Sequence, residues 1–127
     1  MSQLLLDNMP EPVNPNTGWL YVCVNDHVAK VGSSRTERTL WDRLQAHRKQ
    51  ALMRPVFTHR LADYLAQEAA IKHELRDYLI AGSEWFELRD TYVMRRLVEF
   101  MEERGGDTRA LRRAFQRTIA TDERFHL

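Results

Sequence analysis

Five side chains in this sequence could together act on a phosphodiester bond. They are a tyrosine, a lysine, an arginine, a histidine and a glutamate, in chain order Tyr21, Lys30, Arg43, His47 and Glu68. Basic side chains can hold the oxygens of a phosphate, and a carboxylate can bind one divalent metal ion beside them. This order of residue types favours phosphodiester cleavage as the chemistry of the chain.

Arg43 and His47 are expected to act together because they lie four residues apart in an amphipathic stretch. This spacing places two side chains on the same face of a helix, from which both could reach one anion. The surrounding sequence is basic: residues 30–60 hold eight lysine and arginine side chains against two acidic ones, a balance of +6, whereas residues 1–29 carry −3. Such a patch can attract nucleic acid, although basic residues are also common on ordinary solvated helices.

The tyrosine and the lysine are expected on a β-hairpin. Residues 19–24 and 28–32 are rich in strand-forming side chains, and Asn-Asp-His between them suits a turn. A two-residue loop would put Tyr21 on the same face as Cys23 and Lys30, whereas a three-residue loop would move Lys30 to the other face. Both registers stay open, because Asp-His lacks the glycine that favours the tightest turns.

The rest of the sequence predicts helices and one further strand. Glu68 would lie in a long helix along an otherwise apolar stripe, where a charge needs a partner, and Lys72 has the spacing of an ordinary surface ion pair. We expect helices at residues 39–52, 64–80 and 90–103, a last helix capped by Asp107, a strand at 56–61, a short extended segment at 84–88, and Gly82 as the C-terminal cap of the second helix.

The composition predicts one soluble domain. The chain has 127 residues, of which 43% are hydrophobic, which suits one modest core containing Trp19, Trp41, Trp85 and Phe86. No apolar run reaches the roughly 20 residues needed to cross a bilayer, and the amino terminus lacks the pattern of a secretory signal. We therefore expect a cytoplasmic protein without membrane contact. One cysteine, Cys23, offers neither a disulfide framework nor a thiolate metal cluster.

The sequence resembles the GIY-YIG nuclease superfamily. The resemblance spans roughly residues 18–90 and rests on the order of five segments: Gly18-Trp19-Leu20-Tyr21, Lys30-Val31-Gly32, Arg43-Leu44-Gln45-Ala46-His47, Glu68 and Glu84-Trp85-Phe86. It is most similar to the T5orf172 or Mug113 branch, in which the second motif commonly reads Lys-Ile-Gly and the domain ends near Glu-Trp-Phe. No segment is specific by itself, and the joint order carries the resemblance.

The resemblance implies a role for each matching residue. Tyr21 would orient or activate the attacking water, Gly32 would let backbone and substrate approach closely, and Arg43 would stabilise charge on the scissile phosphate. His47 would assist proton transfer or hold the phosphate. Glu68 would bind the divalent metal ion, Mg²⁺ or Mn²⁺, which polarises the phosphate and stabilises the leaving oxygen.

The substrate groove is expected to continue past the second motif. Ser33, Ser34 and Arg35 follow Gly32 directly and could line that groove with it. The alternative for these three residues is an ordinary polar turn between a strand and a helix.

Two departures from the family pattern bear on activity. Lys30 stands where the second motif usually begins with a tyrosine. Its ammonium group could hold phosphate or lower the pKa of Tyr21, or the change could mark a degraded site. Many members also have a late asparagine, whereas no asparagine follows Asn25 in this sequence.

These observations predict an α/β domain of the α+β type, with a small three-stranded, mainly antiparallel sheet flanked by helices. Residues 1–17, which contain three prolines, would form an N-terminal arm, residues 18–104 the GIY-YIG-like domain, and residues 105–127 a C-terminal helical extension.

The expected function is metal-dependent endonuclease cleavage of nucleic acid, with DNA as the first candidate, in a setting related to phage or mobile elements. One carboxylate would cut one strand at a time, so a homodimer would allow two sites to cut both strands. The alternative is a catalytically degenerate module of the same type that binds nucleic acid or a partner protein as a regulator or inhibitor.

Overall fold

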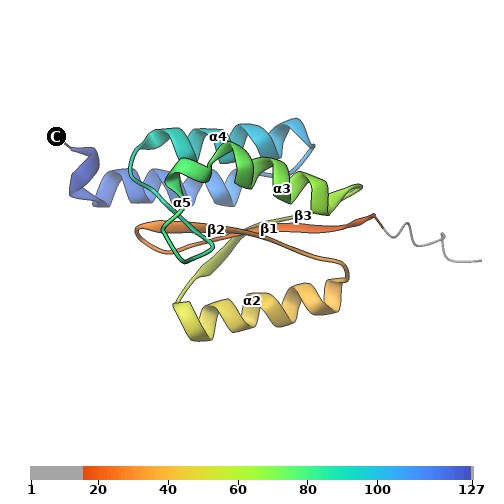
Figure 1. Cartoon of the computed structure of the whole chain (residues 1–127). Coiled ribbons are helices and arrows are strands. Elements are labelled where there is room, and N and C mark those ends of the chain that lie inside the picture. Colours follow the sequence, from red (N-terminus) through yellow and green to blue (C-terminus); the bar gives the residue numbers. More distant parts are fainter. Residues whose placement is uncertain (1–15, 127) are drawn as a thin grey trace, which may run out of the picture.

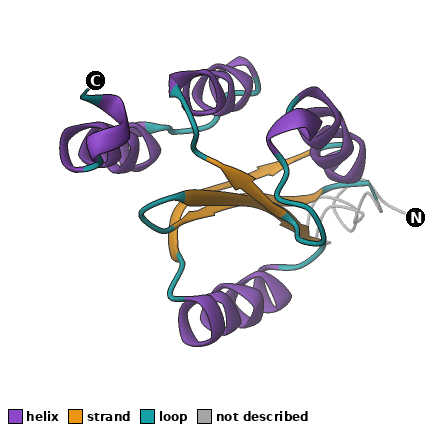
Figure 2. Cartoon of the chain, turned by 60° about the vertical axis from the view of Figure 1, so that its left-hand side comes forward, coloured by secondary structure: helices purple, strands orange, loops and turns teal. Residues whose placement is uncertain are grey.

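A central sheet separates two layers of helices. The computed structural model describes residues 16–126. Helix α2 (Glu37–Ala51) covers one face of the sheet, and helices α3 (Tyr64–Glu74), α4 (Thr91–Glu103) and α5 (Arg109–Thr121) cover the other (Figure 1). Figure 2 shows the same layers from another side, with α2 below the strands. The α+β class predicted from the sequence is confirmed.

In the described part of the chain the sheet has four antiparallel strands, one more than predicted. β1 (Gly18–Val24) pairs with β2 (Val28–Ser34) on one side and with β3 (Arg54–Leu61) on the other. β4 (Trp85–Glu87) joins the free edge of β2, which gives the order β3-β1-β2-β4. The sequence indicated extended structure here without a partner, because three strand residues carry too little alternation to show one.

The hairpin has the register of a two-residue loop. Cys23 lies opposite Lys30, so Tyr21, Cys23 and Lys30 share one face, as one of the two predicted registers requires. Instead of a glycine, the side chain of Asn25 supports the turn: its Oδ1 accepts from the backbone N–H groups of His27 and Val28, each at 3.0 Å. A side-chain oxygen that binds the backbone two or three residues later is a known substitute for turn glycines.

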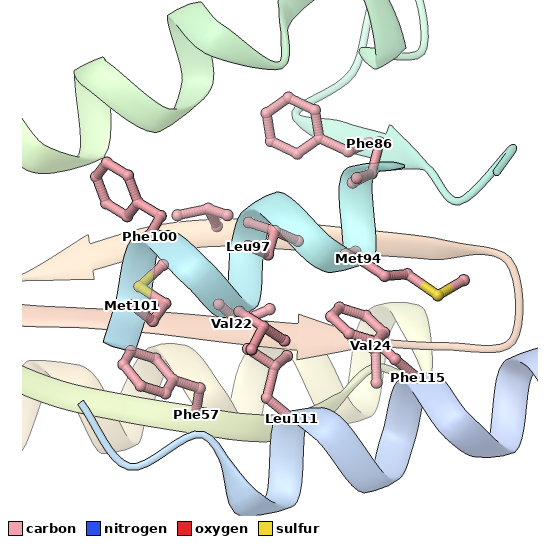
Figure 3. Packing of buried hydrophobic residues seen from close by; sticks show 14 of the residues in the cluster. Val22, Val24, Phe57, Phe86, Met94, Leu97, Phe100, Met101, Leu111 and Phe115 are labelled. Atoms are coloured by element: carbon pink, nitrogen blue, oxygen red, sulfur yellow. The ribbon is translucent and has the colours of Figure 1, made fainter. Parts of the chain in front are cut away.

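The hairpin buries both of its faces, each against different helices. On one face Leu20, Val22 and Val31 belong to the main core, and on the other Tyr21 and Cys23 pack with residues of α2. Figure 3 shows the main core, in which side chains of α4 and α5 meet those of β1 and β3: Leu97, Met101, Leu111, Phe115, Val22 and Phe57. The predicted C-terminal extension therefore packs into the same core as the sheet.

Helix α3 ends earlier than predicted. The sequence pattern continues to residue 80, but the helix stops at Glu74 and is followed by a 3-10 turn, η1 (Arg76–Tyr78). Beyond it, Leu79 forms a bridge with Phe86, and the backbone N–H of Ile80 donates to the carbonyl of Trp85 at 2.9 Å. Pairing with β4 thus outweighs continuation of the helix. Gly82, at φ 75°, lies in the turn before β4 rather than capping a helix.

The starts of the other helices depend on local hydrogen bonds. In α2 the Thr36 side chain accepts from the backbone N–H of Thr39, and the Thr39 side chain returns the contact, so this helix begins two residues earlier than predicted. The last helix begins after Thr108, one residue later than the predicted cap. The predicted residue, Asp107, still serves this end, because its carboxylate accepts from the backbone N–H of Arg109 at 3.1 Å.

Trp41 is not part of the core, contrary to prediction. Its neighbour Leu40 faces the sheet, and successive residues of a helix point about 100° apart. Trp41 is therefore 56% exposed. Phe86 is buried, whereas Trp19 and Trp85 are partly buried against the Tyr21 face of the sheet.

Two further expectations concern the N-terminal arm and contact with membranes. Of the predicted arm at residues 1–17, all but residues 16 and 17 lie outside the described residues. Within residues 16–126, no helix has both the length and the apolar character needed to span a membrane.

The packing of α4 on the sheet yields a stability prediction. Leu97→Ala removes a fully buried side chain and should lower the free energy of unfolding by about 2–5 kcal/mol through reduced burial and the cavity left behind. Leu65→Ala, on the exposed side of α3, should change it by no more than about 0.5 kcal/mol. Urea denaturation of both variants measures the difference, and equal effects would contradict the described core.

Candidate active site

The ring of Tyr21 lies across strand β2 at the position of Gly32. The two residues are direct partners in the antiparallel register, and the tyrosine is almost fully buried. A Cβ atom on Gly32 would lie 2.8 Å from Cε2 of the ring and closer still to Cζ and the hydroxyl oxygen. Gly32 is thus required here because the space of a side chain is already filled by the phenol.

The phenol hydroxyl meets a histidine from helix α2. Oη of Tyr21 and Nε2 of His47 lie 2.9 Å apart, with the two rings tilted by 44° and their centres 5.6 Å apart. The helix is fixed over this face by Leu40 and Leu44, which pack into the same small cluster as the tyrosine. The hairpin and the helix together therefore create a tyrosine–histidine pair from residues 26 positions apart.

The environment keeps the phenol protonated. Burial raises the pKa of Tyr21 to about 12, and Cys23 adds to this rise. The Arg43 guanidinium opposes the rise through its charge and hydrogen bonding, whereas the charge of Glu68 increases it. Arg43 and Glu68, from two different helices, are thus both within electrostatic range of one hydroxyl group.

The environment also keeps the imidazole neutral. Burial lowers the pKa of His47 below its usual 6.5, and the charge of Lys30 lowers it further. Glu84 acts in the opposite direction, and Arg43 adds a smaller lowering. At neutral pH the histidine is therefore uncharged. In the tautomer with the proton on Nδ1, Nε2 accepts a hydrogen bond from the phenol hydroxyl.

Arg43 is oriented by the backbone of the hairpin. Its Nη1 donates to the carbonyl oxygen of Ser33 at 2.6 Å, and the side chain is otherwise exposed. An arginine carries five N–H donors in a planar fork, so the bond to the backbone and the hydrogen bonding with Tyr21 leave other donors to bind a ligand. This arrangement can present a fixed pair of donors to phosphate oxygens.

Lys30 is held by a carboxylate that the sequence did not single out. Its Nζ donates to Oε2 of Glu84 at 2.7 Å, and the lysine side chain is 13% exposed. The same hydrogen bond lowers the pKa of Glu84. Glu84 belongs to one of the family-like segments, but its role depends on the pairing of β4 with β2, which the spacing along the chain does not reveal.

Glu68 forms the ion pair that the sequence offered as its ordinary alternative. Nζ of Lys72 donates to Oε2 of Glu68 at 3.2 Å, and the glutamate side chain is 21% exposed. Within residues 16–126, no three histidine, cysteine, aspartate or glutamate side chains are grouped to hold a metal ion. Mg²⁺ commonly keeps several waters and takes one or two carboxylates with substrate phosphates. The chemistry of Glu68 fits such a hydrated ion if Lys72 moves aside.

The residues after the second motif take structural positions. Ser33 and Ser34 are both buried, and the Ser34 hydroxyl contacts the carbonyl of Thr36, at 3.2 Å, and the hydroxyl of Thr39. Arg35 is exposed. Both serines pair with β1 as the last residues of β2, so the strand runs two residues further than predicted and neither serine lies in a polar turn. Their link to a substrate stays a prediction.

The predicted site residues converge to different degrees. One group is formed by Tyr21, Gly32, Arg43 and His47. Lys30 lies at its border, where its charge acts on His47, and the charge of Glu68 acts on the phenol.

Comparisons with protein-family models, curated proteins and solved structures find no match for this chain. The chemistry of the site therefore has to be inferred from its own geometry. A neutral histidine, His47, contacts the hydroxyl of a neutral tyrosine, Tyr21, and Arg43 lies beside that hydroxyl.

The close approach at Gly32 yields a prediction about the phenol. Gly32→Ala should displace the Tyr21 ring and break its contact with His47, so the tyrosine pKa should fall from about 12 towards the ordinary 10.0. Spectroscopic titration of tyrosinate, with Tyr21→Phe used to assign the signal, measures this shift. The free-energy cost of Gly32→Ala should also shrink in a Tyr21→Ala background, where the space is open. An unchanged high-pH titration would show that the ring does not depend on Gly32.

Proposed function

We propose that this chain is a metal-dependent endonuclease of the GIY-YIG type that hydrolyses phosphodiester bonds, with DNA as substrate. The proposal rests on the hydrogen bond between Tyr21 and His47, at a phenol that also senses the charges of Arg43 and Glu68. A buried tyrosine needs one partner for its hydroxyl, and a structural role does not call for an arginine and a carboxylate as well. In this proposal the enzyme acts in the cytoplasm, in a setting related to phage or mobile elements.

The proton path follows from the two pKa shifts. As a water oxygen attacks phosphorus, Oη of Tyr21 takes a proton from the water and passes its own proton to Nε2 of His47. The phenol therefore never needs to become a free phenolate, which its raised pKa disfavours. The bond from phosphorus to the leaving oxygen breaks, and that oxygen is protonated by solvent. His47 is the final base, a role that suits an imidazole that is neutral at working pH.

Two cations support this path in different ways. Arg43 would bind non-bridging phosphate oxygens with the donors that its bond to Ser33 leaves free, and so stabilise the charge that grows in the transition state. Lys30, paired with Glu84, would act on the base rather than on the phosphate, because its charge helps to keep His47 neutral.

Glu68 would hold the metal ion. Mg²⁺ or Mn²⁺ bound there would act as a Lewis acid on the phosphate and the leaving oxygen. Binding would require the Lys72 ammonium to release Oε2, which is possible because a partly exposed i,i+4 ion pair is weak. One such site cuts one strand at a time, so the expected first product is a nick.

The same ion pairs favour one second candidate. Glu68 is paired with Lys72 and Glu84 with Lys30, so the carboxylate that acts on the phenol and the one that acts on His47 both already have cationic partners. A degenerate module that binds nucleic acid without cutting it would show this pattern as well. That candidate predicts DNA binding that weakens with salt and does not respond to metal ions.

Plasmid nicking tests the proposed activity. Purified protein with Mg²⁺ or Mn²⁺ should convert supercoiled plasmid to the open-circular form, and chelation of the metal should stop the reaction. Glu68→Gln should abolish nicking, because an amide is a far weaker ligand than a carboxylate for a hard cation. Its fold should persist, since the change removes only a partly exposed i,i+4 ion pair worth about 0.3–0.5 kcal/mol.

Glu103→Gln is the matched control, because it removes an exposed carboxylate on α4 outside the site. This variant should nick at the wild-type rate. Nicking by Glu68→Gln at the rate of the control would remove the metal role of Glu68. Metal-independent DNA binding without nicking by the wild type would favour the degenerate module.

A further inference from the structure

A second groove lies where helix α2 meets the edge strand β3. It has a volume of about 540 Å³ and runs between α2, the edge strand β3 and the start of α5. Trp41 and Arg48 line it from α2, Pro55 from β3, and Arg109 and Arg113 from α5. The arrangement of layers in Figure 1 places β3 between these two helices. None of these residues contributes to the tyrosine–histidine pair.

The exposed tryptophan is the first unusual feature of the groove. Trp41 leaves 56% of its surface open, although tryptophan is usually largely buried. Leu44, which is buried, and Pro55 line the groove with it. The result is an aromatic face beside apolar surface, on which a flat ring could stack.

The charge of the groove is the second feature. Arg48, Arg109 and Arg113 stand against Asp107, a balance of +2 among the charged lining residues. Asp107 accepts hydrogen bonds from Nε of Arg109 at 3.0 Å and from Nη2 of Arg109 at 2.7 Å. The charge of Arg113 also contributes to the lowered pKa of Asp107. Arg48 from α2 and Arg113 from α5 therefore remain as exposed cations in the groove that Trp41 lines.

We infer that this groove binds single-stranded nucleic acid, with a base stacked on Trp41 and the adjacent phosphates on Arg48 and Arg113. An aromatic face beside cations is the combination that single strands use, because their bases expose flat faces and their backbone carries regular negative charge. A duplex keeps those faces stacked inside, and an acidic peptide would use the arginines without needing the tryptophan. The inference is separate from cleavage and would hold for a protein that does not cut.

Anisotropy of labelled oligomers, measured in chelator so that no strand is cut, tests the groove. The probes are an oligodeoxythymidine, an oligouridine of equal length, a DNA duplex and polyglutamate as competitor. Trp41→Ala should weaken single-strand binding about tenfold, the effect expected for one stacked base, whereas Trp41→Phe should keep most of the affinity. In the double variant Arg48→Gln/Arg113→Gln, the slope of the logarithm of the binding constant against the logarithm of the salt concentration should become less steep. The expected change is about 0.7 for each phosphate that is no longer neutralised.

Matched controls separate the groove from general effects. Leu65→Ala removes another exposed apolar side chain and Arg95→Gln another exposed arginine, both outside the groove, and both should bind as the wild type does. A Trp41-dependent decrease in affinity for either oligomer supports the inference, and the oligomer bound more tightly identifies the sugar type preferred. Binding unchanged in Trp41→Ala, an equal loss of duplex affinity in Trp41→Ala, or equal competition by polyglutamate would overturn it. Absence of nicking by a protein that still binds single strands through the groove would contradict the proposed activity of the Tyr21 site and leave the groove inference standing.

Discussion

The close contact between the Tyr21 ring and Gly32 is the constraint on which the site depends. Because Gly32 has no side chain, the ring can occupy the space beside it on β2 and bring its hydroxyl to His47 of helix α2. There it meets Nε2 of His47, and burial of the tyrosine raises its pKa. Any side chain at position 32 would push the ring away, and the phenol would lose both its partner and its burial.

The electrostatics of the site consist of a neutral pair surrounded by balanced charges. Tyr21 and His47 are both uncharged at neutral pH, since burial disfavours the ionised form of each. Around them Lys30 is paired with Glu84, and Lys72 with Glu68. These pairs leave Arg43 as the cation aimed at the hairpin with donors to spare. A phosphate would therefore meet an arginine first, beside a proton relay that carries no charge of its own.

Much of this arrangement could be predicted from the sequence, and the parts that could not share a physical reason. The alternation of the first strand predicts that Tyr21 and Cys23 share a face, and helical spacing predicts the shared face of Arg43 and His47, whereas the face of Lys30 depends on the turn. The turn register was left open because the supporting group is a side chain, Asn25, rather than a glycine. Features that depend on pairing between distant segments were missed.

Those missed features all lie near β4 or at the surface of α2. The pairing of β4 with β2 brings Glu84 to Lys30, and pairing of residues 79 and 80 with β4 ends α3 early. Neither effect leaves a pattern in the local sequence, because both depend on the pairing of a three-residue strand, β4, with distant segments of the chain. The exposure of Trp41 was missed for another reason: large aromatic side chains are usually buried, and its position on α2 became decisive only with the orientation of that helix.

Proton transfer from Tyr21 to His47 is tested most directly by the protonation state of His47, measured by nitrogen-15 NMR across a pH titration. We predict an imidazole that stays neutral as the pH falls through 6.5, with a pKa below that value and the proton on Nδ1. In Tyr21→Phe the preference for that tautomer should weaken, because Nε2 loses its donor. A pKa of 6.5 or higher, or a proton on Nε2 in the wild type, would contradict the transfer of a proton from the phenol to His47.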